Sequence, residues 1–165
     1  MPAQDSESLL ERLIRHQVDF VVIGGFAVIA HGVSLLTEDL DVCCPFDEAG
    51  VRRVHGAVAD LHPVHRMTPQ KLPFELTPHL LATLKNVYLR TDLGILDCLS
   101  NVKGVGEFDT VKQHSIVVDL PIGPCRILEL DTLIRSKEAV GGAKDLQAVR
   151  LLKAVQERRN QQGPG

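Results

Sequence analysis

The segments Val22-Ile23-Gly24-Gly25 and Thr37-Glu38-Asp39-Leu40-Asp41-Val42 decide the fold of this chain. The apolar, β-branched residues before the glycine pair predict a short buried strand that ends in a turn. In a second strand, alternate side chains point to the same face, so Asp39 and Asp41 would lie on one face with their Cα atoms about 6–7 Å apart. Two carboxylates placed in this way favour a site for a hard divalent cation.

The length and composition favour one compact domain. The chain has 165 residues, of which 44% are hydrophobic, so it can bury a core of its own. We expect a single domain over residues 1–159, with a C-terminal helical segment at 131–159 and a disordered tail at 160–165. The net charge of -3 does not suggest a protein that coats nucleic acid by bulk electrostatics, although a locally basic groove for RNA remains open.

The chain shows no targeting or membrane signal. Its longest apolar stretch, residues 20–30, is interrupted by the glycine pair and is shorter than the ~20 residues of a membrane helix. The polar and acidic residues 5–8 do not resemble a secretory signal, so we expect a cytoplasmic protein with no membrane partner. The four cysteines, Cys43, Cys44, Cys98 and Cys125, form no C-x-x-C motif. Three of them lie in apolar, strand-like runs and are most simply small buried thiols.

Helical periodicity marks both ends of the chain. Ser8 and Glu11 form a capping-box pattern at the start of an amphipathic helix, and residues 26–31 suggest a short helix stopped by Gly32. Asp47 is placed to cap a helix that runs to about residue 61. Near the C-terminus, two helices over residues 132–140 and 145–159 are separated by Gly141-Gly142.

The sequence between these helices shows patterns typical of strands. Strands are expected at residues 19–23 and 40–44, and hairpins pair residues 86–91 with 94–99 and 115–120 with 125–128. Four prolines within residues 63–78 predict a loop there with one or two short strands. The fold class is α+β or mixed α/β, with strands that are mostly antiparallel.

A third aspartate strengthens the case for a metal site. Asp97 stands alone in the apolar run 94–99, and a lone buried carboxylate must be paired, hydrated or bound to metal. If its strand lies beside residues 39–44, three carboxylates converge and repel one another by about a few kcal/mol per pair. A divalent cation reverses the sign of that interaction, so Asp39, Asp41 and Asp97 are the candidate metal ligands.

The ligands that Mg²⁺ prefers indicate that this site also binds a nucleotide. Mg²⁺ binds through carboxylates together with substrate phosphates, which points to a nucleoside triphosphate. The Gly24-Gly25 turn lacks Cβ atoms, so phosphate oxygens can approach the backbone N–H groups there. Thr37 is equally suited to a strand-start hydroxyl and to a substrate contact.

These motifs resemble those of the DNA polymerase β-like nucleotidyltransferase superfamily. Its signature is a hydrophobic residue, a Gly-Gly or Gly-Ser turn, an Asp-x-Asp pair and a third carboxylate on a neighbouring strand. The C-terminal segments 130–134 and 144–146, with Lys137, look like the helical part of small bacterial members, including abortive-infection toxins. Other members often carry arginine before the Asp-x-Asp run, where this chain has Leu35 and Leu36.

The resemblance implies a mixed central sheet flanked by helices and the transfer of a nucleoside monophosphate from an NTP such as ATP. The acceptor is a hydroxyl of an RNA end, a protein or a small molecule. Two Mg²⁺ ions, or Mn²⁺ in their place, serve as cofactors, and an antitoxin is the partner if the chain is a toxin. Asp39, Asp41 and Asp97 would be catalytic, and the candidate nucleotide contacts are Gly24, Gly25, Thr37, Lys137 and Lys144.

Two other hypotheses stay open at this point. A degenerate transferase fold could act as a nucleotide-binding or protein-interaction module, which would bind without transfer. A glycosyltransferase also uses Asp-x-Asp, but the chain is short for the usual donor domain. The histidines are weaker candidates, because His31 is most simply a capping or packed residue and the spacing of His55, His62 and His65 suits no common zinc motif.

Overall fold

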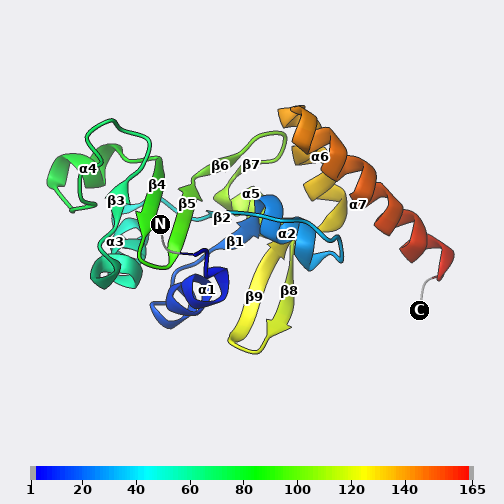
Figure 1. Cartoon of the computed structure of the whole chain (residues 1–165), viewed down its shortest axis with the longest axis horizontal. Coiled ribbons are helices and arrows are strands. Elements are labelled where there is room, and N and C mark those ends of the chain that lie inside the picture. Colours follow the sequence, from blue (N-terminus) through cyan, green and yellow to red (C-terminus); the bar gives the residue numbers. More distant parts are fainter. Residues whose placement is uncertain (1–2, 164–165) are drawn as a thin grey trace.

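The computed structural model describes residues 3–163, and its centre is a seven-stranded sheet with the strand order β3-β4-β5-β2-β1-β9-β8 (Figure 1). The β2–β5 and β1–β9 pairs are parallel and the other neighbours are antiparallel, so the sheet is mixed, as expected. Its strands are β1 Val21–Ile23, β2 Asp39–Cys43, β3 Val64–His65, β4 Asn86–Thr91, β5 Gly94–Leu99, β8 Ser115–Leu120 and β9 Gly123–Leu128.

Helices pack around the sheet, and a small ribbon of β6 and β7 stands between β5 and the C-terminal helices (Figure 1). The helix α1 contacts α3 and the strands β2 and β9, while α6 and α7 pack against each other. The remaining elements are β6 Asn101–Val102, β7 Gly106–Glu107, α1 Ser6–Arg15, α2 Gly24–Ala30, α3 Glu48–Val58 with the 3₁₀ turn Ala59–Leu61, α4 Pro78–Thr83, α5 Phe108–Gln113, α6 Leu130–Val140 and α7 Ala143–Gln161.

The core lies between the central strands and the helices. All three residues of β1 are buried, and the apolar residues Leu40 and Val42 of β2 are fully enclosed, while the aspartates that alternate with them are less buried. The buried leucines of α1 pack onto the same core. All four cysteines are buried and free, so the prediction of buried thiols, made for three of them, is confirmed and holds for the fourth as well. Among residues 3–163, no helix combines the length and apolar character that a bilayer crossing requires.

Several predicted elements occur at or close to their expected positions. The hairpin β4–β5 has the predicted bounds, and β9 begins at Gly123, two residues before the predicted start. Asp47 caps α3 by accepting a hydrogen bond from the backbone N–H of Gly50 at 3.0 Å. The break between α6 and α7 falls at Gly141, whose φ of 73° lies in the left-handed region that favours glycine at a helix end.

Other local predictions were wrong. The first helix is capped by Asp5, whose carboxylate accepts from the N–H of Ser8, so the capping box at Ser8 and Glu11 does not form. Glu11 instead pairs with Arg15 one turn later. Among the prolines, Pro78 begins α4 rather than an extended segment, because the Thr77 side chain caps that helix and the first helical position tolerates proline.

The C-terminus also differs from its expectation. Residues 160–161 were expected in a disordered tail, but they form the last part of α7. The helix extends away from the rest of the molecule toward the C-terminal end (Figure 1). The expectation for residues 164–165 lies outside the described residues.

Candidate active site

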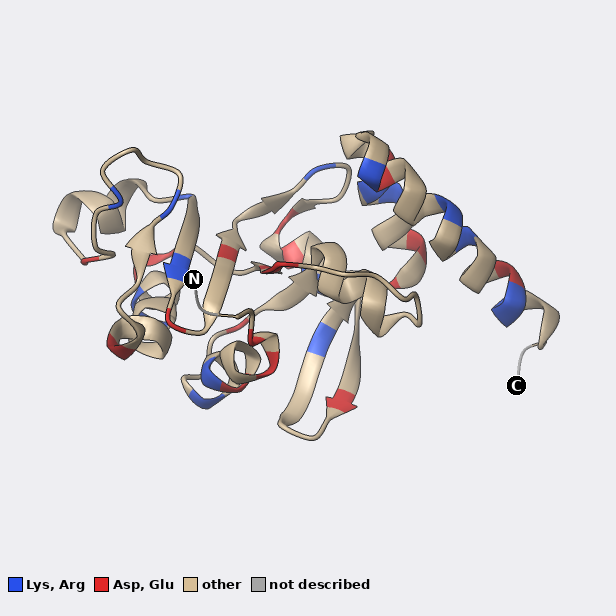
Figure 2. Ribbon diagram, in the orientation of Figure 1, with Lys and Arg blue, Asp and Glu red and all other residues tan. Residues whose placement is uncertain are grey.

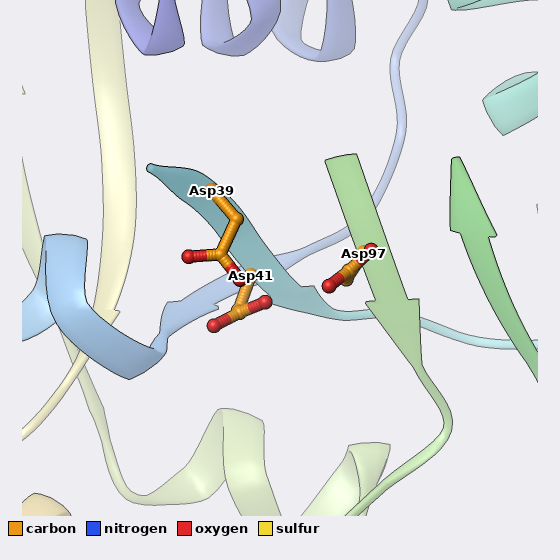
Figure 3. Close-up of side chains that lie close together, drawn as sticks. All are labelled: Asp39, Asp41 and Asp97. Carbon is orange, nitrogen blue, oxygen red and sulfur yellow. The ribbon is translucent and has the colours of Figure 1, made fainter. Parts of the chain in front are cut away.

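The pairing of β2 with β5 brings three carboxylates together. In this parallel register Asp41 lies opposite Asp97, and Asp39 lies opposite Ile95. Figure 3 shows the three aspartates projecting from these two strands into one space, and ligand oxygens of all three lie within 4.8 Å of one another. The predicted meeting of Asp39, Asp41 and Asp97 is therefore confirmed as geometry.

The glycine pair makes room for the acidic strand. A Cβ atom on Gly24 would lie 2.3 Å from Oδ2 of Asp41, and one on Gly25 would lie 2.9 Å from Oγ1 of Thr37. Gly24 also has a φ of 69°, a backbone conformation that other residues adopt at a cost. The glycines thus let β2 and the loop before it pack directly against the start of α2.

A Gly24→Ala substitution tests this role. We expect it to lower the free energy of unfolding by roughly 1–3 kcal/mol and to displace Asp41, because the positive φ and the 2.3 Å contact both oppose a methyl group. Chemical denaturation with and without Mg²⁺ measures both effects. Gly56→Ala in α3 is the matched control, since the added methyl would sit 3.7 Å from its nearest neighbour, Cδ2 of His16, and should be neutral or stabilising. Equal behaviour of the two variants would contradict this role.

Thr37 orients one of the aspartates. Its Oγ1 lies 3.0 Å from the backbone oxygen of Asp39 and 3.3 Å from that residue's Oδ1, and the hydroxyl can donate to either. Thr37 is therefore engaged within the protein at the start of β2. This contact helps to hold the Asp39 carboxylate beside Asp41 and Asp97.

Arg66 is a component of the site that the sequence did not predict. Its Nε donates to Oδ1 of Asp97 at 3.1 Å, and its Nη2 donates to Oδ2 of the same carboxylate. The guanidinium also lies 5.7 Å from the ring centroid of Tyr88 on β4. Arg66 follows β3, and its backbone N–H continues the pairing with β4 by donating to the Tyr88 carbonyl at 3.0 Å. The sequence held one indication of such a residue, because a buried Asp97 needs a partner.

The carboxylates are poorly neutralised within the protein. Burial raises the pKa of Asp41 to about 7, and the charges of Asp39 and Asp97 add to that shift. Burial also raises the pKa of Asp97, which is 4% exposed, although the hydrogen bonds from Arg66 act in the opposite direction. An ionised Asp41 therefore lacks compensation of the kind that a divalent cation would provide.

Two cavities meet at Asp41. The first has a volume of about 620 Å³ and reaches Gly25, Thr37, Asp39 and Lys144. The second has a volume of about 570 Å³ and reaches Gly24, Asp97, Tyr88 and the β6–β7 region. Lys137 lines both cavities with Asp41, and its Nζ lies 3.4 Å from Oδ1 of Asp145. All the candidate site residues named from the sequence thus line one or both cavities.

Acidic and basic side chains gather on different elements around these cavities. Figure 2 shows the acidic segments of β2 and β5 near the centre of the molecule, with basic segments on α6, α7 and the β6–β7 connection. Lys137 lies on α6 and Lys144 at the start of α7, so the turn at Gly141 brings two separate helices to one cavity. The three aspartates and the lysines around them therefore come from widely separated parts of the sequence.

The histidines lie elsewhere in packed or paired positions. His31 is 3% exposed, and its Nε2 makes a 2.8 Å hydrogen bond with the carbonyl of Leu128, which agrees with a packed residue. His62 pairs with Asp92, while His55 and His65 contact Phe74 edge-on. Among residues 3–163, the three-aspartate cluster is the group whose side chains are placed to share a metal ion.

Solved structures with a similar fold are nucleotidyltransferases. The lincomycin-bound lincosamide antibiotic adenylyltransferase LnuA superposes with a TM-score of 0.61 at 13% identity, over 93% of this chain and 99% of that chain. A Thermotoga maritima protein described as a candidate nucleotidyltransferase has a TM-score of 0.56 at 16% identity, over 92% and 91%. ANT(2″)-Ia in complex with adenylyl-2″-tobramycin has a TM-score of 0.53 at 16% identity, over 94% and 92%.

Sequence comparison adds no relative to this set. No protein-family model and no curated protein matches the chain. The likeness to the solved structures covers nearly the whole described chain and includes the mixed sheet with its flanking helices. The chain therefore has the nucleotidyltransferase fold.

Proposed function

We propose that the protein is a Mg²⁺-dependent nucleotidyltransferase that transfers a nucleoside monophosphate from an NTP to an acceptor hydroxyl. The observation that supports this best is the convergence of Asp39, Asp41 and Asp97 at the junction of two cavities. One cavity can hold the donor and the other the acceptor. The carboxylates would then lie where the two substrates meet.

The donor set fits hard divalent cations. Asp39, Asp41 and Asp97 supply oxygen ligands from a rigid sheet, and the raised pKa of Asp41 reflects carboxylates that need a cation. When bound, Mg²⁺ would neutralise phosphate charge and lower the pKa of the acceptor hydroxyl, and Mn²⁺ can take the same role. Thr37 would keep Asp39 oriented, and Arg66 would hold Asp97 on the acceptor side.

The donor fits the first cavity. Gly25 and Thr37 line it beside Asp39, Lys137 and Lys144 offer ammonium groups to a triphosphate, and the apolar side chains of its lining suit a base. These apolar side chains are Val28, Leu35, Leu36, Ala148 and Leu151. The residues that replace the expected arginine, Leu35 and Leu36, would thus contact the base rather than the phosphates.

The reaction exchanges one phosphate ester bond for another. The acceptor oxygen forms a bond to the α-phosphorus while the bond from that phosphorus to the bridging oxygen breaks. Pyrophosphate leaves with that electron pair, and the hydroxyl proton passes to solvent. The chain's part is to hold both substrates and to keep three carboxylates in place, which is the positioning that phosphoryl transfer chiefly needs.

A small molecule is the acceptor that the second cavity favours. Its volume of about 570 Å³ lies in the range of small-ligand sites. The neighbours named above include one structure with lincomycin bound and one with adenylyl-2″-tobramycin. An RNA end or a protein hydroxyl, as for a toxin with an antitoxin partner, is the alternative acceptor.

Nucleotide binding tests the proposal before the acceptor is known. Isothermal titration calorimetry with each of the four NTPs should show binding for at least one of them in Mg²⁺ and a loss of most of that binding in EDTA. Transfer is then followed as pyrophosphate release with candidate acceptors. Binding that ignores the metal, or an absence of binding for every NTP, would contradict a nucleotidyltransferase.

One observation favours a second candidate function, a degenerate module that binds nucleotide without transfer. The Arg66 guanidinium donates to both oxygens of Asp97, so the third carboxylate is already paired with a positively charged side chain. Such a module would bind Mg²⁺ and NTP through Asp39 and Asp41 alone. It would release no pyrophosphate with RNA, protein or small-molecule acceptors, whereas the transferase would do so with one of them.

A further inference from the structure

The second cavity has an unusual balance of charge. Its lining includes three lysines, Lys85, Lys103 and Lys137, and its only carboxylates among the described residues are Asp41 and Asp97. Those two carboxylates belong to the metal site, where bound cations would neutralise them, and Arg66 already contacts Asp97. The part of the cavity that remains for an acceptor is therefore positively charged.

Lys85 and Lys103 are available to a ligand. Both are exposed, and among residues 3–163 neither ammonium group lies within ion-pair distance of a carboxylate. Lys85 directly precedes β4, and Lys103 lies between β6 and β7, so they reach the cavity from two separate elements. Lys137, in contrast, is shared with the first cavity and pairs with Asp145.

The rest of the lining suits a compact polar molecule. Side chains of Asn86, Ser100, Asn101 and Ser136 offer hydrogen-bonding groups, and Tyr88 with a few aliphatic residues provides an apolar wall. Apart from Asp41 and Asp97, which belong to the proposed metal site, no lining residue would compensate the positive charge of a polyamine or an aminoglycoside. For a phosphate or carboxylate group, in contrast, this lining offers the ammonium groups of Lys85 and Lys103, which come from two separate elements.

We propose that the acceptor is a small hydroxyl compound that carries an anionic group, a phosphate or a carboxylate, and that Lys85 and Lys103 bind this group. The proposal rests on the proposed function for the reaction and adds the substrate class. The anionic group would sit away from the three aspartates, and the hydroxyl would point toward Asp97. An RNA end is the less favoured acceptor, because it needs a longer basic track and the chain has a net charge of -3.

A binding experiment tests this class without requiring turnover. Glycerol 3-phosphate and 3-phosphoglycerate serve as anionic probes, glycerol as the neutral one and tobramycin as the cationic one. Each is titrated in Mg²⁺ and a non-hydrolysable ATP analogue, with binding followed by calorimetry or protein-observed NMR. We expect at least one anionic probe to bind about tenfold or more tightly than glycerol and tobramycin.

Variants then show whether the lysines are responsible. In the double variant Lys85→Gln/Lys103→Gln, the affinity for the anionic probe should fall by about tenfold, while the affinity for the ATP analogue stays unchanged. Lys153→Gln is the matched control, because Lys153 is exposed on α7 and lines neither cavity. Thermal unfolding of each variant checks that the fold is retained.

Each other outcome overturns the proposal. The first is that glycerol or tobramycin binds as tightly as the anionic probes, or more tightly. The second is that an anionic probe keeps its affinity in the double variant, because it binds only through metal. The third is that a short RNA binds in preference to every small probe. Failure of the proposed function looks different, because the ATP analogue itself would then not bind in a Mg²⁺-dependent way.

Discussion

Replacing Asp41 with asparagine is expected to reduce nucleotide transfer by roughly a thousandfold or more and to remove Mg²⁺-dependent NTP binding. Asp41 lies between the two cavities and is close to both other carboxylates, so no other ligand can take its place. Asparagine keeps the size of the side chain but not its charge. Calorimetry with NTP and Mg²⁺, followed by pyrophosphate release, measures the two losses separately.

The same substitution should stabilise the metal-free protein. The pKa of Asp41 is raised from 3.8 to about 7 by burial and then by its carboxylate neighbours. A carboxyl group whose pKa is higher in the folded state lowers stability as it ionises, so wild-type stability falls as the pH rises from about 4 to above about 7. At about pH 8, Asp41→Asn should be more stable than wild type by on the order of 2 kcal/mol, and this gain should shrink toward about pH 4.

Only a substitution within the aspartate cluster should both weaken Mg²⁺-dependent NTP binding and stabilise the metal-free protein. Asp119→Asn is a suitable control, since Asp119 is exposed on the edge strand β8, which β1 and β9 separate from β2 in the sheet. That control should retain NTP binding, Mg²⁺-dependent stabilisation and the wild-type dependence of stability on pH. If Asp41→Asn instead destabilised the protein at about pH 8 and kept its response to Mg²⁺, the three aspartates would not form a metal site.

Local pattern was sufficient to predict most strands of the central sheet, although not their order. The hairpin β4–β5 and the strand β2 follow from alternating or apolar runs bounded by turn residues, which depend on near neighbours in the sequence. The order of strands could be inferred only where chemistry supplied a reason, as for Asp97 beside Asp41. The helix at Pro78 was missed because proline is compatible with both a helix start and an extended loop.

The candidate site was predicted only in part. Its aspartates and glycines lie in runs where spacing fixes their direction, and they meet as expected. Arg66 was missed because it follows a two-residue strand within the proline-rich region, where no periodicity sets a register. Lys85 and Lys103 were missed because isolated exposed lysines carry no pattern, and only the fold shows that they border one cavity.

Replacing Arg66 with glutamine is expected to destabilise the metal-free protein and to strengthen its response to Mg²⁺. The guanidinium donates to both oxygens of a nearly buried Asp97, so its loss leaves a carboxylate without its cation. Because the Arg66 side chain is 22% exposed, the cost should be about 2 kcal/mol rather than that of a fully enclosed pair. Chemical denaturation at about pH 8 without Mg²⁺ measures this cost.

The pH and metal dependence of the variant distinguish a site effect from a general defect. The pKa of Asp97 is already raised by burial and is held down by Arg66, so removing the arginine raises it further. A higher folded-state pKa means that the lost stability is largest when Asp97 is ionised, and the defect should therefore decrease as the pH falls from about 8 to about 5.

Mg²⁺ should also restore much of the lost stability, because it supplies the missing positive charge, and less Mg²⁺ should be needed for half of the thermal shift. Arg52→Gln is the matched control, since Arg52 also pairs with a carboxylate but does so on the exposed surface of α3, and its loss should cost less than about 0.5 kcal/mol. Weaker Mg²⁺ binding by Arg66→Gln would instead mean that the arginine holds Asp97 in its ligating orientation rather than competing with the metal for it.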